Sequence, residues 1–293
     1  MNLYDNTEIS SDSVSCDAKD SIDYRIAEAR KELINNFFMT NYIVLFENRL
    51  IMAQYAEIVG SLDMELARLD YKLARSAKKL AFIKSTLSFG QALINSRIET
   101  IVDAQTEKQL TELKTKEKLF QGKLEFMELV DTTGEASLNE IHECYKTLVK
   151  RLNPDITGHK EADDLRIYVL AQKAYQSLDI DQLRALVSIT NSYDYQKCNF
   201  NAKSKSEDSL DLELLLINLE KSAKKLEKIK GCHPYTLKEQ LEDPKWMSQK
   251  RSELENKIAI TKKSLAETTN VIDELLSGVG TKTTYTKDET RLV

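Results

Sequence analysis

The sequence contains little glycine and proline, with 8 Gly and 3 Pro among 293 residues. Strands joined by tight turns depend on these residues, so a chain of this length with so few of them leaves little room for sheets. Charged residues make up 30% of the chain and hydrophobic residues 41%, and Lys, Leu, Glu, Ala and Ile dominate. This is the composition of long helices and coiled coils. We therefore expect an all-α protein.

Cysteine and histidine are also scarce, and their spacing does not indicate a metal site. Cys16, Cys144, Cys198 and Cys232 are scattered without a Cys-x-x-Cys pair. Such cysteines are typical of free thiols in a reducing compartment. The 3 histidines are equally dispersed, and we interpret His142 as an ordinary helical residue rather than a ligand. We predict no metal and no cofactor.

Strong charge of one sign and long apolar runs are missing too. The net charge is −5, from 42 basic and 47 acidic residues, so no bulk attraction to nucleic acid is expected. A membrane-spanning helix needs about 18 or more consecutive apolar residues, whereas charged residues interrupt the nearest candidate, residues 43–59. The N-terminus has neither the basic nor the apolar region of a secretion signal. We expect a cytoplasmic protein that binds neither nucleic acid nor membranes.

Enzyme motifs are absent as well. The sequence has no Gly-rich phosphate loop, no His-Glu-x-x-His, no nucleophile elbow and no convergent set of acidic, His and Cys residues. The many carboxylates lie on helical faces beside lysines, where solvated ion pairs are the ordinary explanation. We predict no catalytic residues and no enzymatic activity.

Apolar residues at helical spacing divide the chain into segments. Residues 1–20 are polar and expected to be disordered, and residues 21–125 are expected to form long helices in an antiparallel coiled-coil hairpin. In this hairpin Gly60-Ser61 is a candidate break and Ser88-Phe89-Gly90 a turn. The aromatic residues Phe37, Phe38, Phe46 and Tyr55 indicate that the first helix is buried on more than one side.

A second coiled-coil hairpin is predicted for residues 209–277, after a linker at 191–208 and before a disordered tail at 278–293. Apolar residues alternate at spacings of three and four along both of its predicted helices. The two seams consist of Leu212, Leu216, Leu219, Ala223 and Leu226, and of Leu254, Ile258, Thr261, Leu265, Thr268, Ile272 and Leu275. The string Ser-Ala-Lys-Lys-Leu occurs at both 76–80 and 222–226. Duplication of a hairpin and chance convergence of lysine-rich helices both explain it.

The segment at 126–190 differs from its neighbours in its helix-starting and helix-ending residues. A polar break at residues 131–134 precedes a helix for which Ser137 is the expected N-cap, with Glu140 completing a capping box. This helix ends at Asn153-Pro154, because proline disfavours the helical conformation of the residue before it. A polar loop then leads to a second helix. The pattern predicts two antiparallel amphipathic helices joined by a proline-containing loop.

This segment resembles the J-domain of DnaJ-type co-chaperones over about 60 residues. In that family a helix of the form Ile-x-x-x-Tyr-x-x-Leu ends in His-Pro-Asp, and a later helix carries Ala-Tyr-x-x-Leu. Here the tripeptide is Asn153-Pro154-Asp155. The residues that match the helices, and that the resemblance implies as the core, are Ile141, Tyr145, Leu148, Tyr168, Ala174, Tyr175 and Leu178, with Asp181 and Arg184 in register after them.

The resemblance also implies a partner. In the family, the His-Pro-Asp loop and the basic face of the preceding helix dock on a DnaK-type chaperone and stimulate its ATP hydrolysis. By resemblance the partner-binding residues here are Asn153, Pro154, Asp155, Lys146, Lys150 and Arg151. Asparagine has no imidazole and cannot be protonated. Loss of such a contact costs about 1–3 kcal/mol, roughly tenfold or more in binding, so stimulation of the ATPase is in doubt.

Two functions follow from these features. The chain is either a J-like co-chaperone or chaperone adaptor, or a structural scaffold that keeps the J-like fold as a protein-interaction module. As an adaptor it would bind a DnaK-type chaperone and a client protein. As a scaffold it would self-associate through its coiled-coil seams, and charges placed at Leu219 or Leu265 would break the assembly.

Overall fold

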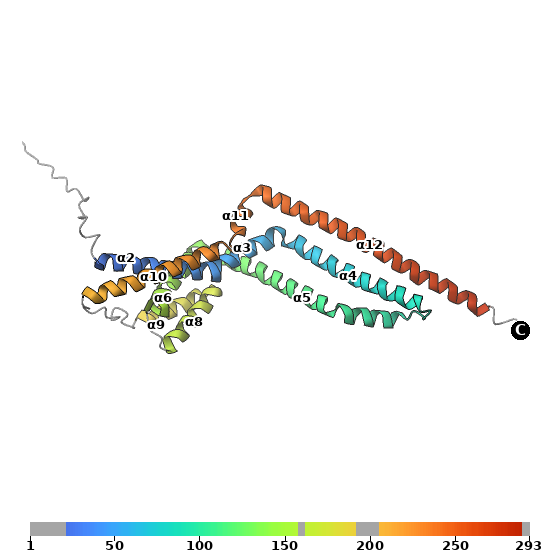
Figure 1. Ribbon diagram of the computed structural model, residues 1–293, viewed down its shortest axis with the longest axis horizontal. Coiled ribbons are helices and arrows are strands. Elements are labelled where there is room, and N and C mark those ends of the chain that lie inside the picture. The colour runs from blue at the N-terminus through green and yellow to red at the C-terminus, as the bar shows by residue number, and fades with distance from the viewer. Residues whose placement is uncertain (1–21, 158–161, 192–204, 289–293) are drawn as a thin grey trace, which may run out of the picture. The chain divides into compact units, whose positions relative to one another are not determined.

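A computed structural model of the chain describes residues 22–157, 162–191 and 205–288. All the elements within these ranges are helices and none is a strand (Figure 1). The predicted fold class, all-α, is confirmed. The predictions for residues 1–20, for Cys16 and Cys198, and for most of the linker at 191–208 lie outside the described residues.

The helices follow one another with short connections. In chain order they are α2 (Ile22–Tyr42), η1 (Ile43–Glu47), α3 (Asn48–Tyr55), η2 (Ala56–Gly60), α4 (Ser61–Ser88), α5 (Asn95–Thr133), α6 (Glu135–Leu152), α7 (Pro154–Thr157), α8 (Ala162–Gln176), α9 (Ile180–Asn191), α10 (Lys205–Lys230), α11 (Leu237–Glu242) and α12 (Pro244–Asp288). The elements η1 and η2 are single π-helical turns. The first five elements therefore form one continuous helix from Ile22 to Ser88.

Gly60 does not break this helix, contrary to the prediction. It ends the π-helical turn η2, and α4 follows directly. A Cβ atom at this position would lie only 2.6 Å from Cε2 of Phe120 in α5. The glycine therefore permits a close approach of α5 to the continuous helix, which is a packing role rather than a turn.

Two other glycines, both with positive φ, do lie between helices. The turn predicted at Ser88-Phe89-Gly90 is present, with Gly90 at φ 65°. Gly134, at φ 74°, separates α5 from α6. Because this glycine precedes Glu135 as the N-cap of α6, the helix starts earlier than expected and the capping box predicted for Ser137 is wrong.

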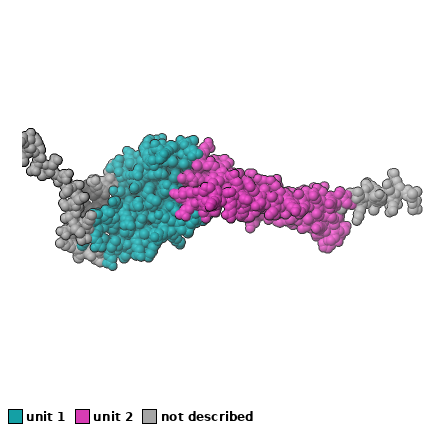
Figure 2. Space-filling model, turned by 90° about the horizontal axis from the view of Figure 1, so that it is seen from above, with its two compact units in different colours: residues 1–49, 130–236 teal, residues 50–129, 237–293 magenta. Residues whose placement is uncertain are grey.

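The chain divides into two compact units (Figure 2). Unit 1 consists of residues 1–49 and 130–236, and unit 2 of residues 50–129 and 237–293. The continuous helix and α5 each contribute to both units. The predicted segment 126–190 therefore falls almost entirely within unit 1.

In unit 1, α10 packs along α2, and the two helices run in the same direction (Figure 1). The Asn36 side chain donates a buried hydrogen bond to Oγ of Ser222, at 3.2 Å. Leu212 is buried, as the seam predicted, but Leu216 is 42% exposed. Ser222, at 6% exposure, occupies the place predicted for Ala223, so the seam is rotated by about one residue.

In unit 2, α12 packs along α4, again in the same direction (Figure 1). Arg251 donates to the backbone oxygen of Ile58 at 3.2 Å, and Lys262 pairs with Glu65 at 2.7 Å. Further along, Ile272 packs with Ile83 of α4.

This pairing corrects the hairpin predicted at 209–277. Its two helices, α10 and α12, belong to different units, and each packs on a part of the first continuous helix. Apolar residues at spacings of three and four recur in all these helices, so the pattern alone does not select a partner. The expected ends also shift, because residues 205–208 and 278–288 are helical.

The other side of α4 faces α5, its antiparallel neighbour in sequence. Arg68 pairs with Glu117 at 2.7 Å, and Lys79 pairs with Glu99 at 2.7 Å. These ion pairs join α4 to α5 near the start of α5 and near its middle. Ile98 and Val102 of α5 join Ile83 and Ile272 in the buried cluster of unit 2.

Candidate functional site

The Asn-Pro-Asp turn lies between α6 and α7. Asn153 adopts an extended conformation, with φ −68° and ψ 117°, as expected for a residue that precedes proline. Its side-chain oxygen accepts a hydrogen bond from the backbone N–H of Asp155 at 3.0 Å. This is the capping arrangement that asparagine favours at a helix start. With 5% exposure, the Asn153 side chain serves the turn itself.

The residues predicted as the core of the segment lie together. Tyr145 of α6 stacks on Tyr175 of α8, with ring centroids 4.0 Å apart and planes 12° from parallel. Tyr168 is partly buried and its hydroxyl accepts a hydrogen bond from Asn41 at 2.9 Å. The other members are fully or almost fully buried, namely Ile141, Tyr145, Leu148, Ala174, Tyr175 and Leu178.

The continuous helix completes this core, which the sequence pattern of 126–190 did not indicate. Phe38 of α2 lies 6.5 Å from Tyr145, and Phe46 of η1 lies 4.9 Å from His142, both between ring centroids. Tyr42 meets the edge of His142 at 5.2 Å. The excess of aromatic residues in the first helix was the sequence signal for this contact, although it did not identify the partner.

The aromatic cluster includes one buried carboxylate, Glu47, which is 5% exposed. Burial and a hydrogen bond to Glu47 raise the pKa of Tyr42. Nδ1 of His142 lies 2.8 Å from the hydroxyl of Tyr175, and burial lowers the pKa of His142 despite the nearby Glu47. At neutral pH His142 is therefore a neutral packing residue.

The three basic residues predicted as a docking face have different surroundings. Arg151 donates hydrogen bonds at 3.0 Å to the backbone oxygen of Val187 and at 3.0 Å to Oγ1 of Thr190, both in α9. Nζ of Lys146 lies over the ring of Phe38, 5.6 Å from its centroid. Lys150 is exposed. The face is thus divided, because two of its three cations contact other helices of unit 1.

Asp155 also faces its own unit. It is exposed, and it lines a pocket of about 290 Å³ between α7, α2 and α10. The other lining residues are Phe37, Asn218, Lys221, Ser222 and Lys225. The aspartate predicted to contact a chaperone therefore lies opposite two lysines of α10.

Comparisons with known proteins add nothing to these contacts. A scan against models of protein families, a search of curated proteins and a search of solved structures find no match to this chain. Within the described ranges, no three His, Cys, Asp or Glu side chains are grouped so that they could hold a metal ion. In the same part of the chain, no helix is both long and apolar enough to cross a membrane.

Proposed function

We propose that this chain is a helical scaffold or adaptor in which the J-like segment at 126–190 is a built-in packing and interaction module. It does not act by stimulating a DnaK-type ATPase. The proposal takes the J-like assignment from the residue pattern described above, and it takes the role of the segment from the contacts of the basic residues. A cytoplasmic location is part of the proposal and comes from the sequence.

The contacts of Arg151 carry this proposal. Both acceptors of its guanidinium are in α9, so the group ties α6 to α9. Using Arg151 to bind a partner would leave Thr190, which is 1% exposed, without this donor. The Thr190 hydroxyl keeps its hydrogen bond to the backbone oxygen of Leu186, so the cost is that of the two bonds from Arg151, about 0.5–1.5 kcal/mol each, which would oppose docking.

Asn153 supports the same conclusion. Its oxygen already accepts the N–H of Asp155, and its side chain is buried. A docking loop needs side chains that point outward and are free to bond, whereas this one stabilises the start of α7. The substitution of the family's histidine therefore fits a structural turn.

An ATPase assay tests the proposal. The full chain is added to a DnaK-type chaperone, and single-turnover ATP hydrolysis is compared for the wild type, Asn153→His and Asp155→Asn, with a functional J-protein as the positive control. We expect no stimulation by any of the three. Stimulation by the wild type that Asp155→Asn abolishes would refute the scaffold function. Stimulation by Asn153→His alone would mean that the docking face is intact and lacks only the imidazole.

Co-chaperone activity is the second candidate, favoured by one observation. Lys150 and Asp155 are both exposed, so a cation of the second helix and the acid of the turn are accessible to a partner. If this function holds, Lys150→Ala and Asp155→Asn both weaken binding to the chaperone. The matched variant Lys173→Ala, at an exposed lysine of α8, leaves binding unchanged.

A further inference from the structure

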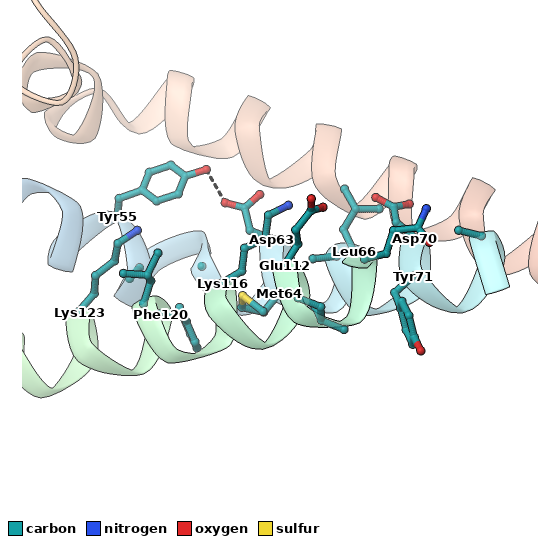
Figure 3. Close-up of a pocket in the computed structure, with 17 residues that line it drawn as sticks. Tyr55, Asp63, Met64, Leu66, Asp70, Tyr71, Glu112, Lys116, Phe120 and Lys123 are labelled. Atoms are coloured by element: carbon teal, nitrogen blue, oxygen red, sulfur yellow. Dashed lines mark hydrogen bonds between the residues drawn. The ribbon is translucent and has the colours of Figure 1, made fainter. Parts of the chain in front are cut away.

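A groove lies in unit 2, between α4 and α5 (Figure 3). Its volume is about 580 Å³. Apolar side chains from both helices line it, including Met64 from α4 and Leu113 and Phe120 from α5. On the α4 side the lining includes the small residues Ala67 and Ala74.

One rim of the groove is a stripe of α5 that we call the α5 stripe: Glu112, Lys116, Leu119 and Lys123. These residues all line the groove and are spaced four, three and four apart, so they lie on one face of the helix. Leu119 is 61% exposed. None of the three charged members forms an ion pair with another residue that the structure describes.

The helix faces around the stripe are already occupied. In unit 2, the seam of α12 is used along α4. Arg68, Lys79 and the ion pairs they form hold the α4-facing side of α5. What α5 leaves outward is a stripe with Glu112 at one end, Lys116 and Leu119 in the middle and Lys123 at the other end.

When two copies of this stripe run antiparallel, the acid of each copy faces a lysine of the other. Glu112 and Lys123 are separated by eleven positions, or about 16 Å along the helix axis. In an antiparallel pair of identical helices, Glu112 lies opposite Lys123 of the partner subunit, and the two-fold axis repeats the contact. Leu119 then packs on the aliphatic stem of the partner subunit's Lys116.

We propose that the α5 stripe binds the same stripe of a second copy of this chain, forming an antiparallel two-fold dimer that covers the groove. Such self-complementary interfaces are the commonest among homo-oligomers. An antiparallel partner needs a lysine opposite Glu112 and an acid opposite Lys123. A second copy of this chain supplies both. The inference goes beyond the proposed function, since it rests on unit 2 alone and does not involve the J-like segment.

Reversal of the two end charges tests the dimer. We compare the full-length wild type with Glu112→Lys, Lys123→Glu and the double variant by sedimentation equilibrium, against a chain mass of 33.5 kDa. We expect the wild type to sediment as a dimer. Each single variant places like charges together at both ends of the interface and weakens the dimer by about tenfold or more. The double variant restores opposite charges and returns the affinity to near the wild-type value.

A matched control lies on another face of the same helix. Glu107 and Lys118 are exposed and have the same separation as the tested pair, but they lie outside the stripe. Reversing either of them should leave the dimer intact, and circular dichroism checks that every variant remains helical. A wild type that is monomeric at all concentrations overturns the proposal. So does a dimer that tolerates both single reversals, or one that the double variant fails to restore.

Discussion

The segment at 126–190 and the middle of α5 differ in how their side chains are used. In the segment, Tyr145 and Tyr175 are 0% exposed and stacked, and Arg151 is bonded to a neighbouring helix. In α5, no residue between Thr106 and Phe126 is buried, and Leu119 is 61% exposed. Arg151 is thus held within its own unit, whereas Glu112, Lys116 and Lys123 of α5 form no ion pair with a residue in the described ranges.

This contrast bears on where a partner would bind. The resemblance placed the interaction surface on the basic face of α6, because a co-chaperone docks there. Two of the three cations on that face, Lys146 and Arg151, contact other helices of unit 1, whereas Lys150 is exposed. A charged face on a helix indicates binding only after its contacts within the chain are known.

Removing one ring of the stacked pair should produce the largest difference between the two regions. Tyr145→Ala leaves a cavity beside Tyr175 and Phe38, so we expect it to lower the free energy of unfolding of unit 1 by about 3–5 kcal/mol. Leu119→Ala, on the exposed stripe, should change the stability of the monomer by less than about 0.5 kcal/mol.

Urea denaturation at low protein concentration measures the free energy of unfolding of both variants. Hydrogen exchange of peptides from α6 and α5 then assigns each change to one region. Exchange resolves the two units if they unfold separately. Equal losses for Tyr145→Ala and Leu119→Ala would mean that the burial contrast between the regions is wrong.

Some of this architecture could be predicted from the sequence, namely where a residue determines the structure of its own neighbourhood. Proline ends α6 at Leu152, and the low content of glycine and proline favours an all-helical chain. Glycine was an ambiguous signal: Gly90 makes a turn, but Gly60 provides room for the ring of Phe120. Only the three-dimensional neighbour separates these two roles.

Partner choice could not be predicted, for a different reason. The seams of α4, α10 and α12 share the same spacing, so each could pair with any of the others. The role of Arg151 was hidden too, because its acceptor is a backbone oxygen of α9 that no sequence motif identifies. The predicted core was easier to find, since its residues combine apolar type with helical period.

The second largest effect should separate two adjacent cations of α6. Arg151→Ala removes both hydrogen bonds to α9 and leaves Thr190 buried without that donor. We expect a loss of about 1–3 kcal/mol in the stability of unit 1. Lys150→Ala, at the exposed neighbour, should change it by less than about 0.5 kcal/mol. Denaturant titration of both variants measures these changes in stability. Equal changes would mean that the bonds of Arg151 to α9 do not stabilise unit 1, and Arg151 would again be a candidate docking residue.

A smaller effect is expected where α5 approaches Gly60. An alanine favours a helix interior by about 1 kcal/mol over glycine, but at this position its Cβ meets the ring of Phe120. Gly60→Ala should therefore be near neutral in the wild type and stabilising by about 1 kcal/mol in a Phe120→Ala background. Gly122→Ala is the matched control, since nothing lies within 4 Å of its added Cβ. It should stabilise the protein by a similar amount in both backgrounds. Thermal denaturation of the wild type, the two single variants and the double variant measures these changes. If the effects of Gly60→Ala and Phe120→Ala on stability simply add, the ring does not oppose the substitution.

The smallest effect concerns His142, which is half-buried within the aromatic cluster of unit 1. Burial lowers its pKa in the folded state below the ordinary value of 6.5. The unfolded chain therefore takes up a proton first as the pH falls, and the stability of unit 1 should decrease between about 6.5 and the lower folded pKa, while it stays constant at higher pH. His142→Gln removes this group. Its unfolding free energy, measured by urea titration from about pH 5 to 8, should fall less steeply on the acid side than that of the wild type. Identical slopes would mean that the histidine is protonated without cost in the folded cluster, and that its contact with Tyr175 tolerates the charge.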